Sequence, residues 1–524
     1  MNRLRIITVV AAIAFFAVGA MADESWRYSV VGENSSNPAE KSRIDFYNST
    51  SVTVGFNHEL EKEAVVIEEG RGHNLADITV VTRQHLKNGE VWGGASFTTG
   101  SLRDIRFNSA SDYRNVAPYV VADSVGGSRS VQQYSFLGGY SAEAGERLTW
   151  GAEMAYRAGI EYRNRDPRVK NIVSDFRLSA GLTASLFDKS YLGASAGLHL
   201  YNQDSDVEFY NPMNSIHEFV ATGVGTTFAR FYGSTSSSAY KGLGLVSNLQ
   251  FVAGNGMRLA AGFDYDDMDF ILRDYNDLTL ANIDNYKVSG EIAYSIGNIG
   301  VITEFADNAK IKPHLNVDWN RRIGRENIFG TATGNSYPVI GDRQYYWRDL
   351  FDADLTVEMK FPLRTYRKYG ILLVAPEVIY AFSDEHYRQP VRHFKADWLT
   401  FGTKLGFEQV TFPSLLKYGV NAGVFYTAAN DKESVFEGFD VEKMYHQAVL
   451  HNFEMLSSDR LALSADMFID VPISKTTVSG KDGHGVVSHT TVNYSLFFSA
   501  SFEHYAYSHH GDINQVSVRA GLKF

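Results

Sequence analysis

Residues 147–163, "RLTWGAEMAYRAGIEYR", decide the fold class because they alternate with a period of two over their whole length. Side chains of a β-strand point to opposite faces in turn, whereas a helix repeats every 3.6 residues. The stretch therefore predicts one long strand with an apolar face and a polar face. The apolar or aromatic face carries Leu148, Trp150, Ala152, Met154, Tyr156, Ala158, Ile160 and Tyr162.

The same alternation returns in several later stretches, which are longer than the roughly 5–6 residues typical of a sandwich strand. Strands of about 9–11 residues or more can cross a bilayer at a tilt. We therefore expect an all-β transmembrane antiparallel β-barrel over 51–524, with about 18 strands within a range of roughly 16–20. A soluble β-sandwich or β-helix is the alternative. The other alternating stretches are 172–186, 191–201, 257–266, 286–296, 461–471, 492–503 and 516–524.

Connections of two lengths join the predicted strands. Short turns are expected at 141–147, 187–190, 254–256 and 457–460, while 202–240 is a long polar stretch. Short turns at one end and long loops at the other are typical of outer-membrane barrels. The turn at 457–460 conflicts with this scheme, because counting back from the C-terminus places it among the long loops.

The two ends of the chain indicate export to an outer membrane. Residues 1–22 read as a signal peptide, with Arg3 and Arg5 before an apolar run and a small-residue cleavage site at Ala22. Residues 23–50 follow as a short periplasmic or lumenal extension. The chain stops on "VSVRAGLKF", which resembles the signal read by the barrel-assembly machinery of Gram-negative bacteria. Its apolar positions include Val518, Ala520, Leu522 and Phe524.

Composition restricts the classes of function further. The chain has no cysteine, which excludes disulfides, thiolate metal sites and cysteine nucleophiles. Its 34 Phe, 30 Tyr and 45 Gly beside only 11 Pro favour strands. The net charge of −11 argues against a nucleic-acid partner.

Charged residues on the polar faces of the strands predict a polar lumen, as a water-filled or loop-plugged barrel requires. We expect the lumen-facing charges to include Glu153, Arg157, Glu161, Asp175, Arg177, Arg258, Asp264 and Asp266.

The segment "YRNRDPRVKN" (162–171) concentrates cations around one proline, which should end the preceding strand. Guanidinium groups match phosphate and carboxylate geometry. The cluster could bind anions in a pore or lipopolysaccharide phosphates at the barrel rim, or be ordinary solvated surface. Its members are Arg163, Arg165, Arg168 and Lys170.

Other sites are weaker on the sequence alone. The histidines at 484, 489, 504, 509 and 510 show no recognised ligand spacing, so no metal site and no cofactor are expected. No nucleophile elbow or base–orienter pair stands out, so an outer-membrane hydrolase is a minor alternative. The aromatic run 345–349, "YYWRD", fits an interfacial girdle better than a sugar-binding platform.

The stretch "EYRNRDPRVKNIVSD" (161–175), the strands after it and the C-terminal ending resemble an uncharacterised outer-membrane β-barrel family of Bacteroidota. The resemblance extends from about residue 130 onward. That family has no assigned activity, and its genes lie near TonB-dependent receptors. The resemblance implies a channel or accessory component in the uptake of a solute across the envelope. The alternative is a non-conducting barrel that docks a TonB-dependent receptor or a surface lipoprotein; lipid and lipopolysaccharide are further expected partners.

Overall fold

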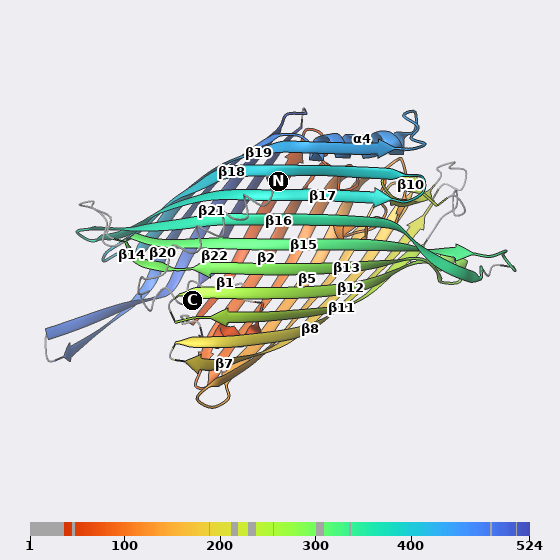
Figure 1. Ribbon diagram of the computed structural model, residues 1–524. Coiled ribbons are helices and arrows are strands. Elements are labelled where there is room, and N and C mark those ends of the chain that lie inside the picture. Colours follow the sequence, from red (N-terminus) through yellow and green to blue (C-terminus); the bar gives the residue numbers. More distant parts are fainter. Residues whose placement is uncertain are drawn as a thin grey trace, which may run out of the picture.

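A single antiparallel sheet closes on itself to form a barrel (Figure 1). The computed structural model describes residues 36–43, 48–187, 189–210, 218–228, 237–254, 256–299, 309–334, 337–482, 485–509 and 511–524. Within them, 18 strands follow one another around the ring, and the last pairs with the first. The predicted all-β barrel and its expected number of strands are confirmed.

The barrel strands differ in length, from 12 residues in β22 to 27 residues in β16. A short β14 (Ile296–Ile299) adds to the edge of one of them. The 18 strands are β1 (Ser49–Glu61), β2 (Gly72–Leu86), β3 (Gly89–Ile105), β5 (Gly127–Glu143), β6 (Leu148–Tyr162), β7 (Arg168–Phe187), β8 (Ser190–Glu208), β11 (Ser238–Val252), β12 (Met257–Leu272), β13 (Leu278–Tyr294), β15 (Ala309–Phe329), β16 (Val339–Thr365), β17 (Lys368–Tyr387), β18 (Arg392–Thr411), β19 (Leu416–Phe436), β20 (Arg460–Asp482), β21 (Gly485–Tyr507) and β22 (Asp512–Lys523).

The closing seam joins the two ends of the sheet. β1 and β22 pair from Ser51 opposite Lys523 to Glu61 opposite Ile513. Beyond this ladder, the backbone N–H of Phe524 donates to the carbonyl of Thr50 at 2.8 Å. Closure leaves no open sheet edge, which is the condition for strands to lie in lipid.

Alternation along each strand separates an apolar outer face from a polar inner face. Leu182 is 59% exposed, whereas its neighbour Thr183 is 1% exposed. On β6, Trp150, Met154 and Ile160 are exposed in the same way on the outer face. Such a continuous apolar exterior is the surface that lipid covers in an outer-membrane barrel.

The two ends of the barrel carry connections of different length. The end of the barrel at which β1 begins and β22 stops has tight turns at 87–88, 144–147, 366–367 and 412–415. We call it the turn end. The opposite end, the loop end, carries the long connections 62–71, 106–126, 209–237 and 437–459. In outer-membrane barrels the short turns usually face the periplasm and the long loops the outside of the cell.

The expected turn at 457–460 is wrong, and the structure removes the conflict that it caused. Ser457 to Asp459 end a long connection that contains the helix α4 (Met444–Leu456). Apolar residues of this helix are buried, Ala448 and Val449 among them, so the segment packs onto the barrel and is not a simple turn. The loop end therefore keeps its long connections.

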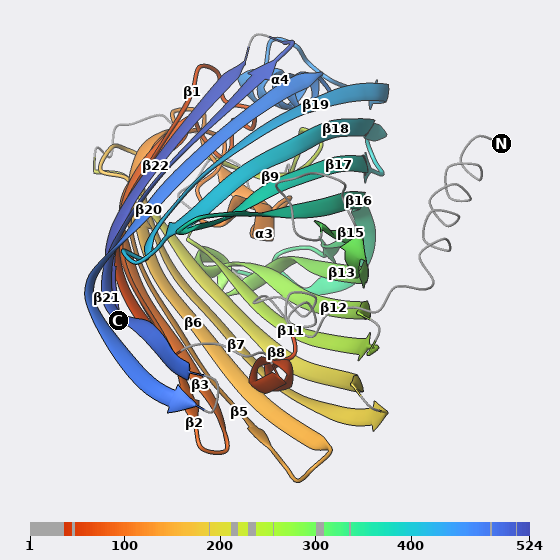
Figure 2. The same ribbon diagram turned by 90° about the vertical axis from the view of Figure 1, so that its left-hand side faces the viewer.

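The remaining elements lie inside the ring or at its rim (Figure 2). No helix in the described ranges is long and apolar enough to span a membrane, a finding that does not bear on strands. These elements are η1 (Pro38–Arg43), α3 (Tyr113–Val116), η2 (Arg273–Tyr275), α4, and the separate sheet of β4 (Val120–Ala122), β9 (Phe219–Gly223) and β10 (Thr226–Thr227).

Candidate functional site

The inner wall carries a chain of alternating charges, which runs from β6 across β7 and β8 to β12. The Arg157 guanidinium donates to Asp175 at 3.2 Å and to Asp112, from the 106–126 loop, at 2.5 Å. His199 joins the chain with Nε2 at 3.1 Å from Asp175 and Nδ1 at 2.7 Å from Asp266. The polar lumen is therefore cross-linked by ion pairs, with each charge partly neutralised by the next.

Residues 36–43 occupy the lumen towards the turn end. Glu40 is fully buried and accepts hydrogen bonds from Arg258 and Tyr191, both at 3.0 Å. Lys41 donates to Glu153 at 2.5 Å, and Arg43 donates to Thr183 at 2.7 Å. This short segment is held by charge-assisted bonds to inward-facing residues of β6, β7 and β12.

A plug fills the lumen towards the loop end, where α3 and β9 lie within the ring (Figure 2). We use "plug" for residues 106–126 together with residues 218–228. Their three-stranded sheet packs on apolar residues of the inner wall, and the contact is buried throughout. Wall residues in this cluster include Tyr240, Met268, Phe270, Leu272, Leu280 and Ile283.

Polar anchors tie the plug to the wall around the barrel. On one side, Arg129 of β5 is 1% exposed, donates to Asn108 and Ala110 carbonyls, and pairs with Glu161 at 2.5 Å. On the other side, Arg322 of β15 donates to the Ala117 carbonyl at 2.5 Å. A plug held from opposite walls spans the lumen and cannot swing aside without breaking buried hydrogen bonds.

Helix α4 and the 62–71 connection meet over the plug. Asn452 donates to the Glu68 carboxylate at 2.6 Å, and its side-chain oxygen accepts from the Ile67 N–H at 3.0 Å. Burial raises the pKa of Glu68 to about 7, since a charged carboxylate is costly away from water. Burial also lowers the pKa of His446, whose Nε2 lies 3.1 Å from the Gly225 carbonyl of the plug.

A cavity of about 470 Å³ lies between the plug and the wall. It is lined mainly by polar and charged side chains from both sides. The charged members are Glu68, Glu69, Asp112, Arg114, Arg157, Glu161, Asp175 and Arg177. A space of this size and polarity can hold water or a small polar solute.

The lumen-facing charges expected from the sequence occupy the inward rows of β6, β7 and β12. Glu153, Arg157, Glu161, Asp175, Arg258 and Asp266 make the contacts described above. Arg177 lies near Asp175 at 3.5 Å, and Asp264 pairs in register with Lys287. The residues that the sequence reasoning missed are their partners on the plug and on residues 36–43.

The cation cluster of 162–171 does not act as one group. Arg163 is 2% exposed and donates to Asp123 of the plug at 2.8 Å, so it is a plug anchor and not a surface contact for lipopolysaccharide. Arg165, Arg168 and Lys170 are exposed, and Arg168 lies over the ring of Tyr210 at 4.6 Å. The strand does end before Pro167, since β6 stops at Tyr162 and β7 begins at Arg168.

The C-terminal histidines are dispersed in the described part of the chain. His504 bonds to Asn514 and His509 to Glu454. Residues 484 and 510, as well as the side chain of residue 489, lie outside the described residues. In the run 345–349, Tyr346 turns inward and donates to Glu385 at 2.8 Å, whereas Trp347 stacks on His386.

The structure is similar at low sequence identity to several solved outer-membrane proteins. The outer membrane transporter YddB from Escherichia coli is 9% identical, with 92% of this chain and 81% of that chain covered at a TM-score of 0.38. BauA, the ferric preacinetobactin receptor from Acinetobacter baumannii, is 9% identical, with 91% of this chain and 80% of that chain covered at a TM-score of 0.38. The FrpB iron transporter from Neisseria meningitidis is 10% identical, with 93% of this chain and 82% of that chain covered at a TM-score of 0.37.

Sequence comparison places the chain more directly. No curated protein sequence matches it. One family model matches residues 38–524, which includes the segment before residue 130 that the sequence resemblance did not reach. The match spans the plug, residues 38–43 in the lumen and every barrel strand. The chain therefore belongs to the family of unknown function DUF6850.

Proposed function

We propose that this protein is an outer-membrane barrel sealed on its extracellular side, which serves envelope uptake as a non-conducting accessory component. The observation that carries the proposal is the apolar inner wall at the loop end. Phe270, Leu272, Leu280 and Ile283 face the lumen and are fully buried by the plug. Water-filled pores line their lumen with polar residues, so an apolar wall indicates a permanent cover.

The accessory role rests on the resemblance to barrels encoded near TonB-dependent receptors. A sealed barrel could dock such a receptor or a surface lipoprotein through its loop end. The lumen residue His199 is not placed to act as a general base, because both of its ring nitrogens are bonded to carboxylates. A general base needs a free nitrogen to take a proton from a nucleophile.

A gated channel is the second candidate, favoured by the charged cavity between the plug and the wall. The contact of Arg157 with Asp112 joins plug and wall through a salt bridge at the cavity, away from the apolar cluster. If the plug were released, the wall of β6–β8 would present a polar surface to a solute.

Planar-bilayer recording distinguishes the two candidates. The purified barrel should show no steady conductance, while a variant in which residues 108–122 are replaced by a short Gly-Ser linker should form an open pore. Steady conductance of the unaltered protein would refute the sealed barrel. Affinity isolation from the native outer membrane tests docking: a receptor or lipoprotein should accompany the unaltered barrel in fixed ratio.

A further inference from the structure

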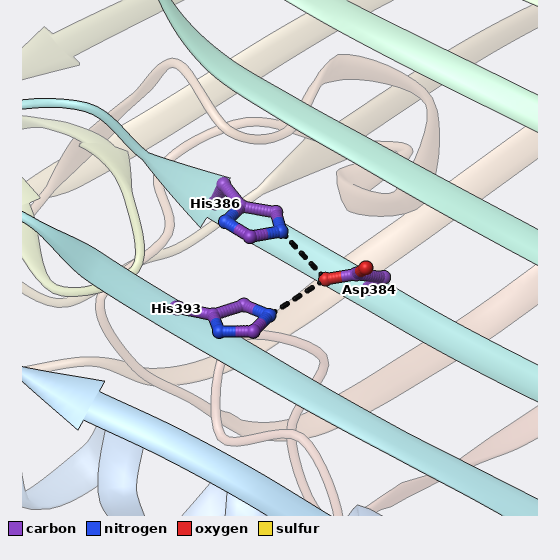
Figure 3. A group of neighbouring side chains, drawn as sticks. All are labelled: Asp384, His386 and His393. Atoms are coloured by element: carbon purple, nitrogen blue, oxygen red, sulfur yellow. Dashed lines mark hydrogen bonds and ion pairs between the residues drawn. The ribbon is translucent and has the colours of Figure 1, made fainter.

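Two histidines and one aspartate meet on the outer face of the hairpin β17–β18 (Figure 3). His386 of β17 stands directly opposite His393 of β18. Asp384 lies two residues before His386, so it points to the same face. Among the described residues, this is the group of histidine and carboxylate side chains whose ligand atoms lie close enough for one metal ion, all within 4.8 Å of one another.

The outward direction of the group follows from the strand pattern. Even-numbered residues of β17 face outward, as the exposed Leu372 and Val378 show, and the odd-numbered Ala375 and Glu377 are buried. Next to the group, Glu385 points inward and accepts from Tyr346 of the inner wall. The hairpin ends at 388–391 on the loop end, so the group lies near the extracellular rim.

Aromatic rings fix the height and the orientation of the group. Phe382 on the same row stacks with Phe351 at 5.4 Å, as expected for the girdle at headgroup depth. Trp347 lies parallel to His386 at 4.7 Å, and the His386 ring lies parallel to that of His393 at 3.9 Å. The two imidazoles are thus held face to face by rigid strands.

The ligand atoms converge as metal coordination requires. Nε2 of His386 and Nε2 of His393 each lie 2.7 Å from the same carboxylate oxygen of Asp384 (Figure 3). A tetrahedral ion with bonds of about 2.0–2.1 Å needs its ligand atoms about 3.3 Å apart. To bind the ion, the two His–Asp distances would have to lengthen from 2.7 Å to this value by rotation of the three side chains.

We propose that Asp384, His386 and His393 bind one divalent transition-metal cation of the Zn²⁺ class. Two imidazoles and one carboxylate form a donor set that suits Zn²⁺, Cu²⁺ and Ni²⁺ better than Ca²⁺ or Mg²⁺. Three protein ligands leave a coordination position open towards the outside of the barrel. Asp349 stands opposite Asp384 in register and adds negative charge, whereas Lys395 stands opposite it on the other side and opposes a bound cation.

Titration of the intact, detergent-solubilised barrel with Zn²⁺ tests the proposal. The unaltered protein should bind one equivalent through this site, and His386→Gln should weaken that binding at least tenfold. His504→Gln is the matched control. His504 of β21 bonds to Asn514 of β22, so this substitution should leave Zn²⁺ binding unchanged. With Co²⁺ as the probe, the site should produce a visible absorption band that His386→Gln removes.

Lys395→Met is a second variant with the opposite expectation. Removal of this charge should tighten Zn²⁺ binding several-fold, whereas a group that only forms hydrogen bonds would show no metal affinity to tighten. Absence of a Co²⁺ band in the unaltered protein, or equal Zn²⁺ affinity in the unaltered, His386→Gln and Lys395→Met proteins, would overturn the proposal. The Lys395→Met result decides the matter even if His386→Gln fails to insert.

Discussion

Two arginines five residues apart provide a matched test of how the plug is held. Arg163 and its partner Asp123 are 1% and 0% exposed at their side chains and lie 2.8 Å apart. Arg168 and Asp166 form a more exposed pair, with 45% and 16% exposure and a distance of 3.2 Å. We expect Arg163→Met to release the plug and Arg168→Met to leave it in place.

The magnitude follows from burial. Removal of one partner of a buried pair leaves an uncompensated charge and costs about 3–5 kcal/mol. An exposed pair contributes about 0–1 kcal/mol. The backbone N–H groups of Val125 and Gly126 also donate to Asp123 and would still stabilise its carboxylate after Arg163 is replaced. We therefore expect a cost near the lower value, about 3 kcal/mol, for Arg163→Met.

Amide hydrogen exchange in the folded barrel measures this cost locally. Exchange of residues 106–126 reports the free energy of local opening. A loss of about 3 kcal/mol corresponds to roughly hundred-fold faster exchange, since each 1.4 kcal/mol is tenfold. The strand amides of β6 should not change. Equal exchange of 106–126 in the two variants would show that the Arg163–Asp123 pair does not hold the plug.

Further predictions concern the bilayer, pH and assembly. Phe136→Arg on the exposed face of β5 should lower the free energy of unfolding in vesicles by about 2–4 kcal/mol and the inward Gln133→Arg much less, so equal urea midpoints would contradict the assigned faces. Because the raised pKa of Glu68 is about 7, its neutral form stabilises the contact with α4 at low pH, and this stability is lost as the pH rises through 7. A spin label on a cysteine introduced at Glu63 should therefore become more mobile between pH 5 and 8, and Glu68→Gln should make this change smaller. Phe524→Asp should leave unassembled protein in the periplasm, which fractionation of the cell envelope would reveal; normal insertion would exclude a role for the terminal residue in assembly.

The barrel could be predicted from the sequence because the alternation of apolar and polar residues is visible within each strand by itself. Alternation along 147–163 depends only on lipid outside and polar contacts inside, and neither requires knowledge of a distant residue. The same reasoning finds the seam strand at 516–524. It fails at 457–460, where an amphipathic helix in a connection breaks the simple rule of alternating turns and loops.

The plug could not be predicted in the same way, because its partners lie far away in the chain. The apolar run "VAPYVVA" (116–122) in a connection, together with the inward positions of Phe270 and Leu280, was an available signal that something covers the lumen. Arg163 looked like one more surface cation, because its neutralising partner lies 40 residues earlier. The His386–His393 pair was also accessible: counting the hairpin register across 388–391 places the two histidines opposite each other.

The placement of residues 36–43 inside the ring has a consequence for the order in which the protein is built. Glu40 is bonded to Arg258 within the lumen, while β1, which follows in the chain, belongs to the wall and pairs with β22 at the opposite end of the sequence. Either β22 pairs with β1 when residues 36–43 are already enclosed by the sheet, or residues 36–43 enter the lumen through the turn end after the seam has closed. In the first case Glu40 and Arg258 act during biogenesis as an internal template on which the curving sheet is wrapped. Pulse-labelled assembly of Glu40→Gln would then stall as an open sheet before the seam forms, whereas late entry would leave the rate of closure unaffected.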